Sequence, residues 1–169
     1  MTRPLQDLPD QALLDYIFTQ LNQRMAAYPE EPLEGHLRGL SQLPRGLHAM
    51  ATTCALDANL AISGLAWHFA QWSDARFTAE TLRGLRELDA EPLAHTVETA
   101  WQLVRPYLRD LAESCRESSD AFEAWYRESA LAKELAPLDD DLRSVLSPEN
   151  HGIYHIWLAY ARKNPERLS

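Results

Sequence analysis

The chain has 169 residues, of which 46% are hydrophobic and 24% charged, a composition ordinary for a folded domain. This length fits one domain over residues 1–169, because single cores commonly occupy about 100 to 200 residues. The formal net charge of −9 argues against direct binding of a nucleic acid, since phosphate contacts need an excess of lysine and arginine. A basic protein partner would instead be attracted.

The signals of cellular compartment are few. Cys54 and Cys115 are the chain's 2 cysteines, and without a CxxC motif they are expected to be free thiols of a reducing compartment. The first residues, MTRPLQDLPD, lack the apolar core of a signal peptide, and no run approaches the length of a membrane span. We therefore expect a cytoplasmic protein that has no contact with a membrane.

The N-terminal part of the chain has the spacing of helices. A helix is predicted over residues 10–27, capped by Asp10 and packed as an N-terminal element on the rest of the domain. Its apolar face is expected to consist of Leu14, Phe18, Leu21 and Met25. A short helix over 33–40 follows, and Pro44 suits the first turn of a third helix because its missing N–H would have no partner there.

The third helix carries the stretch LDANLAISGLAWHFAQW, residues 56–72, where Ser63 and Gly64 interrupt the apolar pattern. Glycine adopts positive φ angles at little cost and commonly ends helices. We therefore expect Ser63 and Gly64 to form a structural turn that lets a second helix begin at a new angle. Such a turn needs no active site.

Further helices are predicted in the second half of the chain. One covers 79–88, and a longer one begins at Glu91 and is kinked or divided by Pro106. The next begins with Ser118 or Ser119 as its N-cap and ends before Pro137.

A last helix is predicted from Pro148 to about Asn164, and no segment alternates as a strand would. The fold class is therefore all-α, a bundle of about seven or eight helices. The tryptophans are expected to be packing anchors because they bury large areas; they are Trp67, Trp72, Trp101, Trp125 and Trp157.

The strongest enzymatic motif is HGIYH, in which His151 and His155 stand four residues apart and could share a metal on a helix. Position 152 is glycine, where a zinc-protease helix has glutamate, and no third ligand is evident. P-loop, GxGxxG and GxSxG motifs are absent from the sequence. We expect no catalytic residue, no metal and no cofactor, and keep a metal-dependent enzyme at these histidines as a weaker alternative.

Negative charge is concentrated in one segment. Residues 110–141 hold ten acidic and three basic residues, a net charge of −7 out of the total of −9. If one helix ran through 110–120, four of these carboxylates would share a face. The candidate partner-binding residues are Asp110, Glu113, Glu117, Asp120, Glu123, Asp139, Asp140 and Asp141. The alternative interpretation is a solvated helix surface with no partner.

The stretch from Leu56 onward resembles a bacterial family of otherwise unknown function, known through a DNA-mimic protein (the DMP-like family). The family pattern runs Leu-Asp-x-Glu-Val-x-Asn-Gly-Gly-Phe-x-Gln-Phe-Phe. The chain matches it at Leu56, Asp57, Leu60, Gly64 and Phe69, and departs from it at Asn59, Ile62, Ser63, Leu65 and Trp67. The segment LRELDAEPLAHTVETAWQLV and the tail from LAPLDDDLRSVL to ARKNPERL are similar to the family's later helices. The resemblance covers about residues 43–168.

The resemblance implies an acidic, all-helical homodimer that binds a basic, DNA-binding protein such as a transcription regulator. Its carboxylates would stand in for phosphates and occlude the partner's DNA-contacting surface. The alternative class is an inhibitor or immunity-type protein for a toxin or enzyme, which would need only the same rigid acidic surface. A scaffold without an electrostatic role would bind in a manner insensitive to salt.

Overall fold

The computed structural model describes residues 4–29, 32–147 and 152–169, and within these ranges it contains helices and no strands. The α-helices are α1 (Asp10–Met25), α2 (Leu33–Ser41), α3 (Arg45–Gln71), α4 (Ala75–Glu87), α5 (Glu91–Val104), α6 (Leu108–Glu117), α7 (Ser119–Glu128), α8 (Ala130–Val145) and α9 (Tyr154–Lys163). Short 3-10 helices are η1 (Leu5–Asp7), η2 (Arg105–Tyr107) and η4 (Pro165–Leu168). The prediction of an all-α fold is confirmed.

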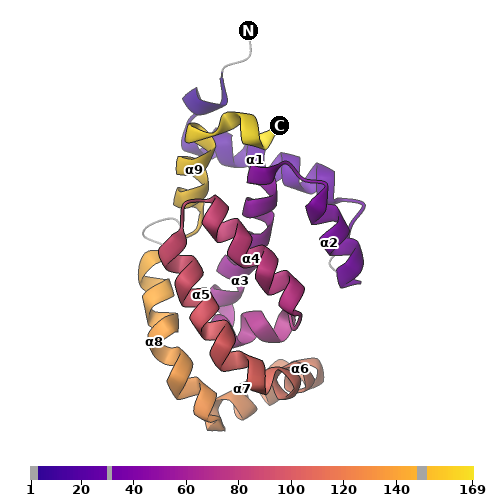
Figure 1. Ribbon diagram of the computed structural model, residues 1–169, viewed down its shortest axis with the longest axis vertical. Helices are drawn as coiled ribbons and strands as arrows, with labels where there is room; N and C mark the ends of the chain where they lie inside the picture. The colour runs from indigo at the N-terminus through magenta and orange to yellow at the C-terminus, as the bar shows by residue number, and fades with distance from the viewer. Residues whose placement is uncertain (1–3, 30–31, 148–151) are drawn as a thin grey trace.

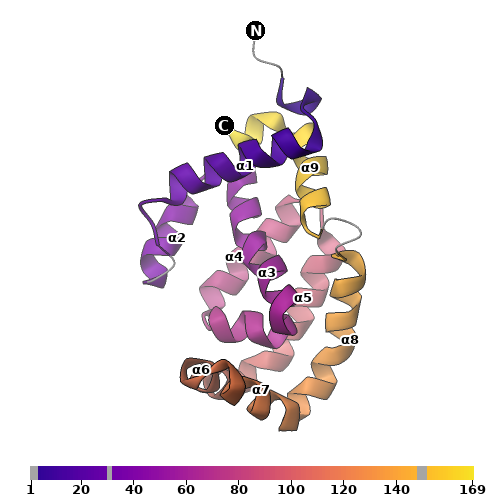
Figure 2. The same ribbon diagram turned by 180° about the vertical axis from the view of Figure 1, so that it is seen from behind.

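Helix α3 runs through the middle of the molecule and packs against α4, α5, α6 and α8 (Figure 1). Helices α1 and α9 and the C-terminus lie at one end, whereas α6 and α7 lie at the other end in both views (Figures 1 and 2). The α6 and α7 part of the acidic segment therefore forms the end of the molecule that is remote from its termini.

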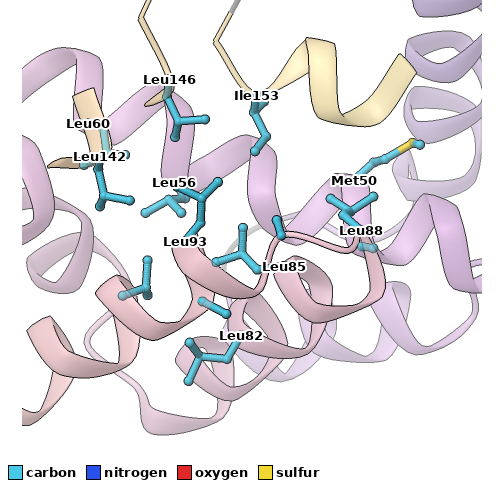
Figure 3. Packing of buried hydrophobic residues seen from close by; sticks show 14 of the residues in the cluster. Met50, Leu56, Leu60, Leu82, Leu85, Leu88, Leu93, Leu142, Leu146 and Ile153 are labelled. Atoms are coloured by element: carbon cyan, nitrogen blue, oxygen red, sulfur yellow. The ribbon is translucent and has the colours of Figure 1, made fainter. Parts of the chain in front are cut away.

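The core is one cluster of buried residues that draws on helices from α1 to η4. Leu56 of α3, Leu85 of α4 and Leu142 of α8 point into it from different sides, as the close view shows (Figure 3). Among the tryptophans, Trp157 is fully buried and Trp101 is 9% exposed, while the other three are partly buried against the same cluster.

The first helix differs in detail from its sequence pattern. Its N-cap is Pro9, and Asp10 is the first helical residue, whose carboxylate accepts a hydrogen bond from Arg162 Nη2 at 2.6 Å. The buried positions of α1 are Leu13, Ile17 and Leu21. Of the expected apolar face, Leu21 is buried, while Leu14, Phe18 and Met25 are partly buried against the core.

The prolines have different effects. Pro106 divides its helix as predicted, since η2 separates α5 from α6. The expectation of a helix end before Pro137 is wrong, because α7 already ends at Glu128, Ser129 after it is extended, and α8 continues through Pro137. Pro137 is exposed, so water can reach the backbone group that loses its helical partner there. The expected helix start at Pro148 lies outside the described residues.

Helix α4 begins at Ala75, four residues before the predicted start. Asp74 caps it: the carboxylate accepts the N–H of Arg76 at 2.7 Å. This cap lies in the sequence SDAR, where serine and aspartate are common N-cap residues, but the polar residues around it hide the beginning of the apolar pattern.

Candidate functional site

The break in α3 lies at Ser63 and Gly64, which have non-helical backbone angles; Gly64 has φ 81° and ψ −166°. In a continuous helix the N–H of Leu65 would donate to the carbonyl of Ala61. Here it donates to Oδ1 of Asp139 in α8, at 2.8 Å. A side chain from another helix therefore replaces a backbone bond, and the two parts of α3 run in different directions (Figures 1 and 2).

Asp139 is buried, with 5% of its surface exposed. Burial raises the pKa of this carboxyl above its ordinary value, and the hydrogen bond from the N–H of Leu65 opposes the shift. The carboxylate is also so close to Gly64 that a Cβ there would lie 2.7 Å from Oδ2. Asp139 is thus enclosed against the α3 break, and a partner cannot reach it as it reaches a surface carboxylate.

Glu123 of α7 also faces the α3 break. It is half-buried, and its Oε1 accepts a hydrogen bond from the hydroxyl of Ser63 at 2.7 Å. Two of the eight candidate carboxylates, Glu123 and Asp139, therefore bind the chain's own turn. The acidic segment and the Ser63–Gly64 turn, which were separate features of the sequence, are joined in the structure.

The carboxylates of α6 point outward. Asp110, Glu113 and Glu117 are all exposed, and their spacing of three and four residues places them on one face. Glu113 accepts a hydrogen bond from Nε of Arg109 at 3.0 Å, in a pair whose side chains are 85% and 56% exposed. Such an exposed pair is weak, so a partner's arginine can compete with Arg109 for Glu113.

Asp120 does not extend the face of α6, because the helix ends at Glu117. Ser118 is extended and caps α7, with its hydroxyl accepting the N–H of Ala121 at 3.0 Å. Asp120 is exposed in the first turn of α7, where a carboxylate stabilises the helix. The row of four carboxylates expected for one continuous helix is therefore a row of three beside a separate fourth.

On α8, Asp140 and Asp141 are exposed, in contrast to their neighbour Asp139. The outward-facing set of candidate residues is therefore Asp110, Glu113, Glu117, Asp120, Asp140 and Asp141. Helices α6 and α7 form the end of the molecule away from the termini, and α8 runs from that end along one side (Figure 1).

Asp57 has a structural role that the sequence analysis did not find. Its Oδ1 accepts the N–H of Ile153, just before α9, at 3.1 Å. Burial raises the pKa of Asp57, and the hydrogen bond from Ile153 opposes the shift. Gly152, with φ 57°, has no Cβ to collide with this carboxylate. The sequence hinted at this role only through the place of Asp57 among apolar helix positions, and nothing in the sequence identified Ile153 as its partner.

Glu87 is a further carboxylate with a structural role that the sequence analysis missed. Its side chain is 7% exposed and accepts hydrogen bonds from Tyr160 and, at 2.6 Å, from Nη1 of Arg167, and it pairs with Arg45. Burial raises the pKa of Glu87, but these hydrogen bonds and charges outweigh it and leave the pKa lowered. The contact joins α4 to the C-terminal η4, and no local sequence pattern predicts it.

Of the two histidines of the HGIYH motif, His151 lies outside the described residues. Nδ1 of His155 lies 2.6 Å from the carbonyl oxygen of Gly152. Within the described ranges there is no group of three or more His, Cys, Asp or Glu side chains arranged to hold a metal ion. Nor do these ranges contain a helix that is both long and apolar enough to cross a membrane.

Comparison with known proteins gives one match. The family model described as DMP19-like protein matches residues 41–164, most of the chain. Among curated proteins and among solved structures, nothing matches. The matched region begins just before α3, contains the Ser63–Gly64 turn and all the outward-facing carboxylates, and ends with α9. The chain therefore belongs to the DMP19-like protein family.

Proposed function

We propose that this protein is an acidic protein-binding module that occupies the DNA-contacting surface of a basic, DNA-binding protein such as a transcription regulator. The observation that carries the proposal is the outward-facing row Asp110, Glu113 and Glu117 on α6. The family is of the DNA-mimic type, which supports the same interpretation.

The spacing of these carboxylates suits the purpose. At 1.5 Å per residue, the row on α6 presents a carboxylate about every 5 Å along the helix axis. Phosphates follow one another at about 3.4 Å of axis along each DNA strand. The two rows have the same sign, and both repeat within a few ångströms. Lysine and arginine side chains that bind phosphates can therefore also reach these carboxylates, and arginine can pair with them through two hydrogen bonds. Binding would exclude DNA by occupying the same surface.

The test is affinity capture from the native lysate at low and moderate salt, with bound proteins identified by mass spectrometry. We expect a DNA-binding protein to be captured at low salt and released by salt or by added duplex DNA. The variant D110N/E113Q/E117Q is expected to lose this partner. A protein released by neither salt nor DNA would contradict the proposal, and a captured toxin or enzyme indifferent to DNA would support the inhibitor class instead.

A matched control removes three other charges. Asp7, Asp15 and Glu166 are exposed and lie on η1, α1 and η4, at the other end of the molecule from α6. The variant D7N/D15N/E166Q has the same net charge as the α6 variant. If both variants lose the partner equally, overall charge and not the α6 surface holds it. The homodimer and the cytoplasmic location stay predictions, the first tested by sedimentation of the purified protein.

A further inference from the structure

Ile62 is an exposed apolar residue in an unusual place. It directly precedes the α3 break, and 66% of its surface is exposed. Among the described residues, Val145 is the other exposed large hydrophobic residue, at 43%. A single exposed apolar side chain is ordinary on a protein surface. The surroundings of Ile62 therefore decide whether it has a role.

Those surroundings form a hollow of mixed lining, in which polar surface exceeds apolar surface. Ile62 borders a hollow of about 390 Å³ between α3, α7 and α8. Its apolar lining is Ile62, Ala132, Ala136 and the ring of Tyr126, and its polar lining is Ser63, Glu123, Asp139, Asp140 and Arg143. Arg143 belongs both to this hollow and to a second one of about 580 Å³. The second hollow has the apolar residues Leu60, Ala61 and Leu146 in its wall. We call the two hollows together the α3–α8 groove.

The charges at the α3–α8 groove are mainly negative. Asp57, Glu123 and Asp140 line it, in addition to the buried Asp139, whereas Arg143 is the basic residue in its described lining. Asp140 is exposed and so available to a partner. The first part of α3 also ends here, and the carboxyl end of a helix carries partial negative charge. The groove thus combines an apolar wall, in its second hollow, with a preference for cations around Ile62.

We propose that the α3–α8 groove docks an amphipathic helix of a protein partner, with apolar side chains against Ile62 and a lysine or arginine toward Asp140. The projecting Ile62 suits the apolar stripe of a helix. This inference rests on the proposed function, in that the helix belongs to the same basic partner. The inference goes beyond that function in one respect: the partner is held by apolar contact at the groove as well as by charge.

The test uses the full chain and a fluorescent peptide of about 18 residues, with leucines at helical spacing and lysines between them. A second peptide keeps the lysines and replaces the leucines by serines. By fluorescence anisotropy, Ile62→Ala is expected to weaken binding of the leucine peptide roughly tenfold, at low and high salt alike. Asp140→Asn is expected to weaken it at low salt only. The serine peptide should be insensitive to Ile62→Ala.

Val145 provides the matched control. It lies nine residues after Ala136 in α8, which places it on the opposite side of that helix from the groove. Val145→Ala should therefore leave the affinity for the leucine peptide unchanged, and both variants are surface changes that should keep the melting temperature. Equal affinities of Ile62→Ala and Val145→Ala for the leucine peptide would overturn the inference. It would also be overturned if Ile62→Ala weakened binding of the serine peptide as much as binding of the leucine peptide.

The two proposals can fail separately. If lysate capture yields no DNA-displaceable partner but the leucine peptide still depends on Ile62, the proposed function fails and the groove remains a docking site for amphipathic helices. If a DNA-displaceable partner is captured equally by the wild type and by Ile62→Ala, the proposed function stands and the inference is overturned.

Discussion

Carboxylates that look alike in the sequence behave in two ways in this molecule. Those of α6, Asp110 and Glu117 among them, face solvent, whereas Asp139 and Glu123 face the α3 break and bind its backbone N–H and its serine hydroxyl. The first kind is free to meet a partner, and the second kind maintains the direction of α3. Acidity of a segment therefore does not by itself define a binding surface, because part of the charge holds the fold.

The largest expected effect falls on the turn itself. Gly64→Val places a β-branched residue at φ 81° and a Cβ within 3 Å of the Asp139 carboxylate. We expect a loss of about 3 kcal/mol or more in the free energy of unfolding, and a melting temperature lower by roughly 10 °C. Thermal unfolding followed by circular dichroism measures it.

A matched pair of alanine substitutions sharpens this prediction. Gly64→Ala is expected to destabilise the protein, whereas Gly35→Ala in α2 should be neutral or stabilising, because nothing lies within 4 Å of the added Cβ. An unchanged melting temperature for both Gly64 variants would show that the turn tolerates side chains.

The next effect concerns the inward-facing carboxylate. Asp139→Ala leaves the N–H of Leu65 buried without its acceptor, which costs about 1 to 3 kcal/mol. Its exposed neighbour provides the control: Asp140→Ala should change the free energy of unfolding by less than about 0.5 kcal/mol. Urea denaturation of the two variants checks the contrast, and equal losses would mean that burial does not separate these residues.

A smaller effect is a dependence on pH. The folded state raises the pKa of Asp139 above its ordinary 3.8, so the folded protein holds this proton more tightly than the unfolded chain. Its contribution to stability is therefore most favourable below pH 3.8 and is lost as the pH rises through the raised pKa. Asp139→Asn keeps a side-chain oxygen as acceptor but cannot titrate. Between pH 7 and pH 4, the wild type should gain stability relative to this variant; parallel curves would contradict the prediction.

The smallest expected effect on stability belongs to the outward-facing row. The variant D110N/E113Q/E117Q should shift the melting temperature by less than about 2 °C, since these side chains are exposed and the Arg109–Glu113 pair is solvated. If this variant loses the partner but keeps its melting temperature, the α6 carboxylates serve binding, whereas Asp139 serves stability. A large destabilisation would show that the row holds the fold instead.

The sequence predicts the helices well, because their apolar spacing, capping residues and Pro106 are local signals. The same rules placed a helix end before Pro137 and missed the break at Ser129, which separates α7 from α8, because serine is a weaker helix-ending signal than proline. Local spacing also could not separate Asp139 from Asp140. Their different burial follows from how α8 packs on α3, and the contact that decides it joins residues 74 positions apart.

That long-range contact also bears on how the chain folds. In an ordinary helix each N–H finds its acceptor four residues earlier, so a helix can form before anything docks on it. At Leu65 the acceptor is Asp139, and it becomes available only when α8 is in place. The N–H of Leu65, at the start of the second part of α3, should therefore gain its acceptor late, after the more local contacts of the chain have formed. Hydrogen exchange at the Leu65 amide requires this hydrogen bond to open. Its rate therefore measures how often α8 separates from α3.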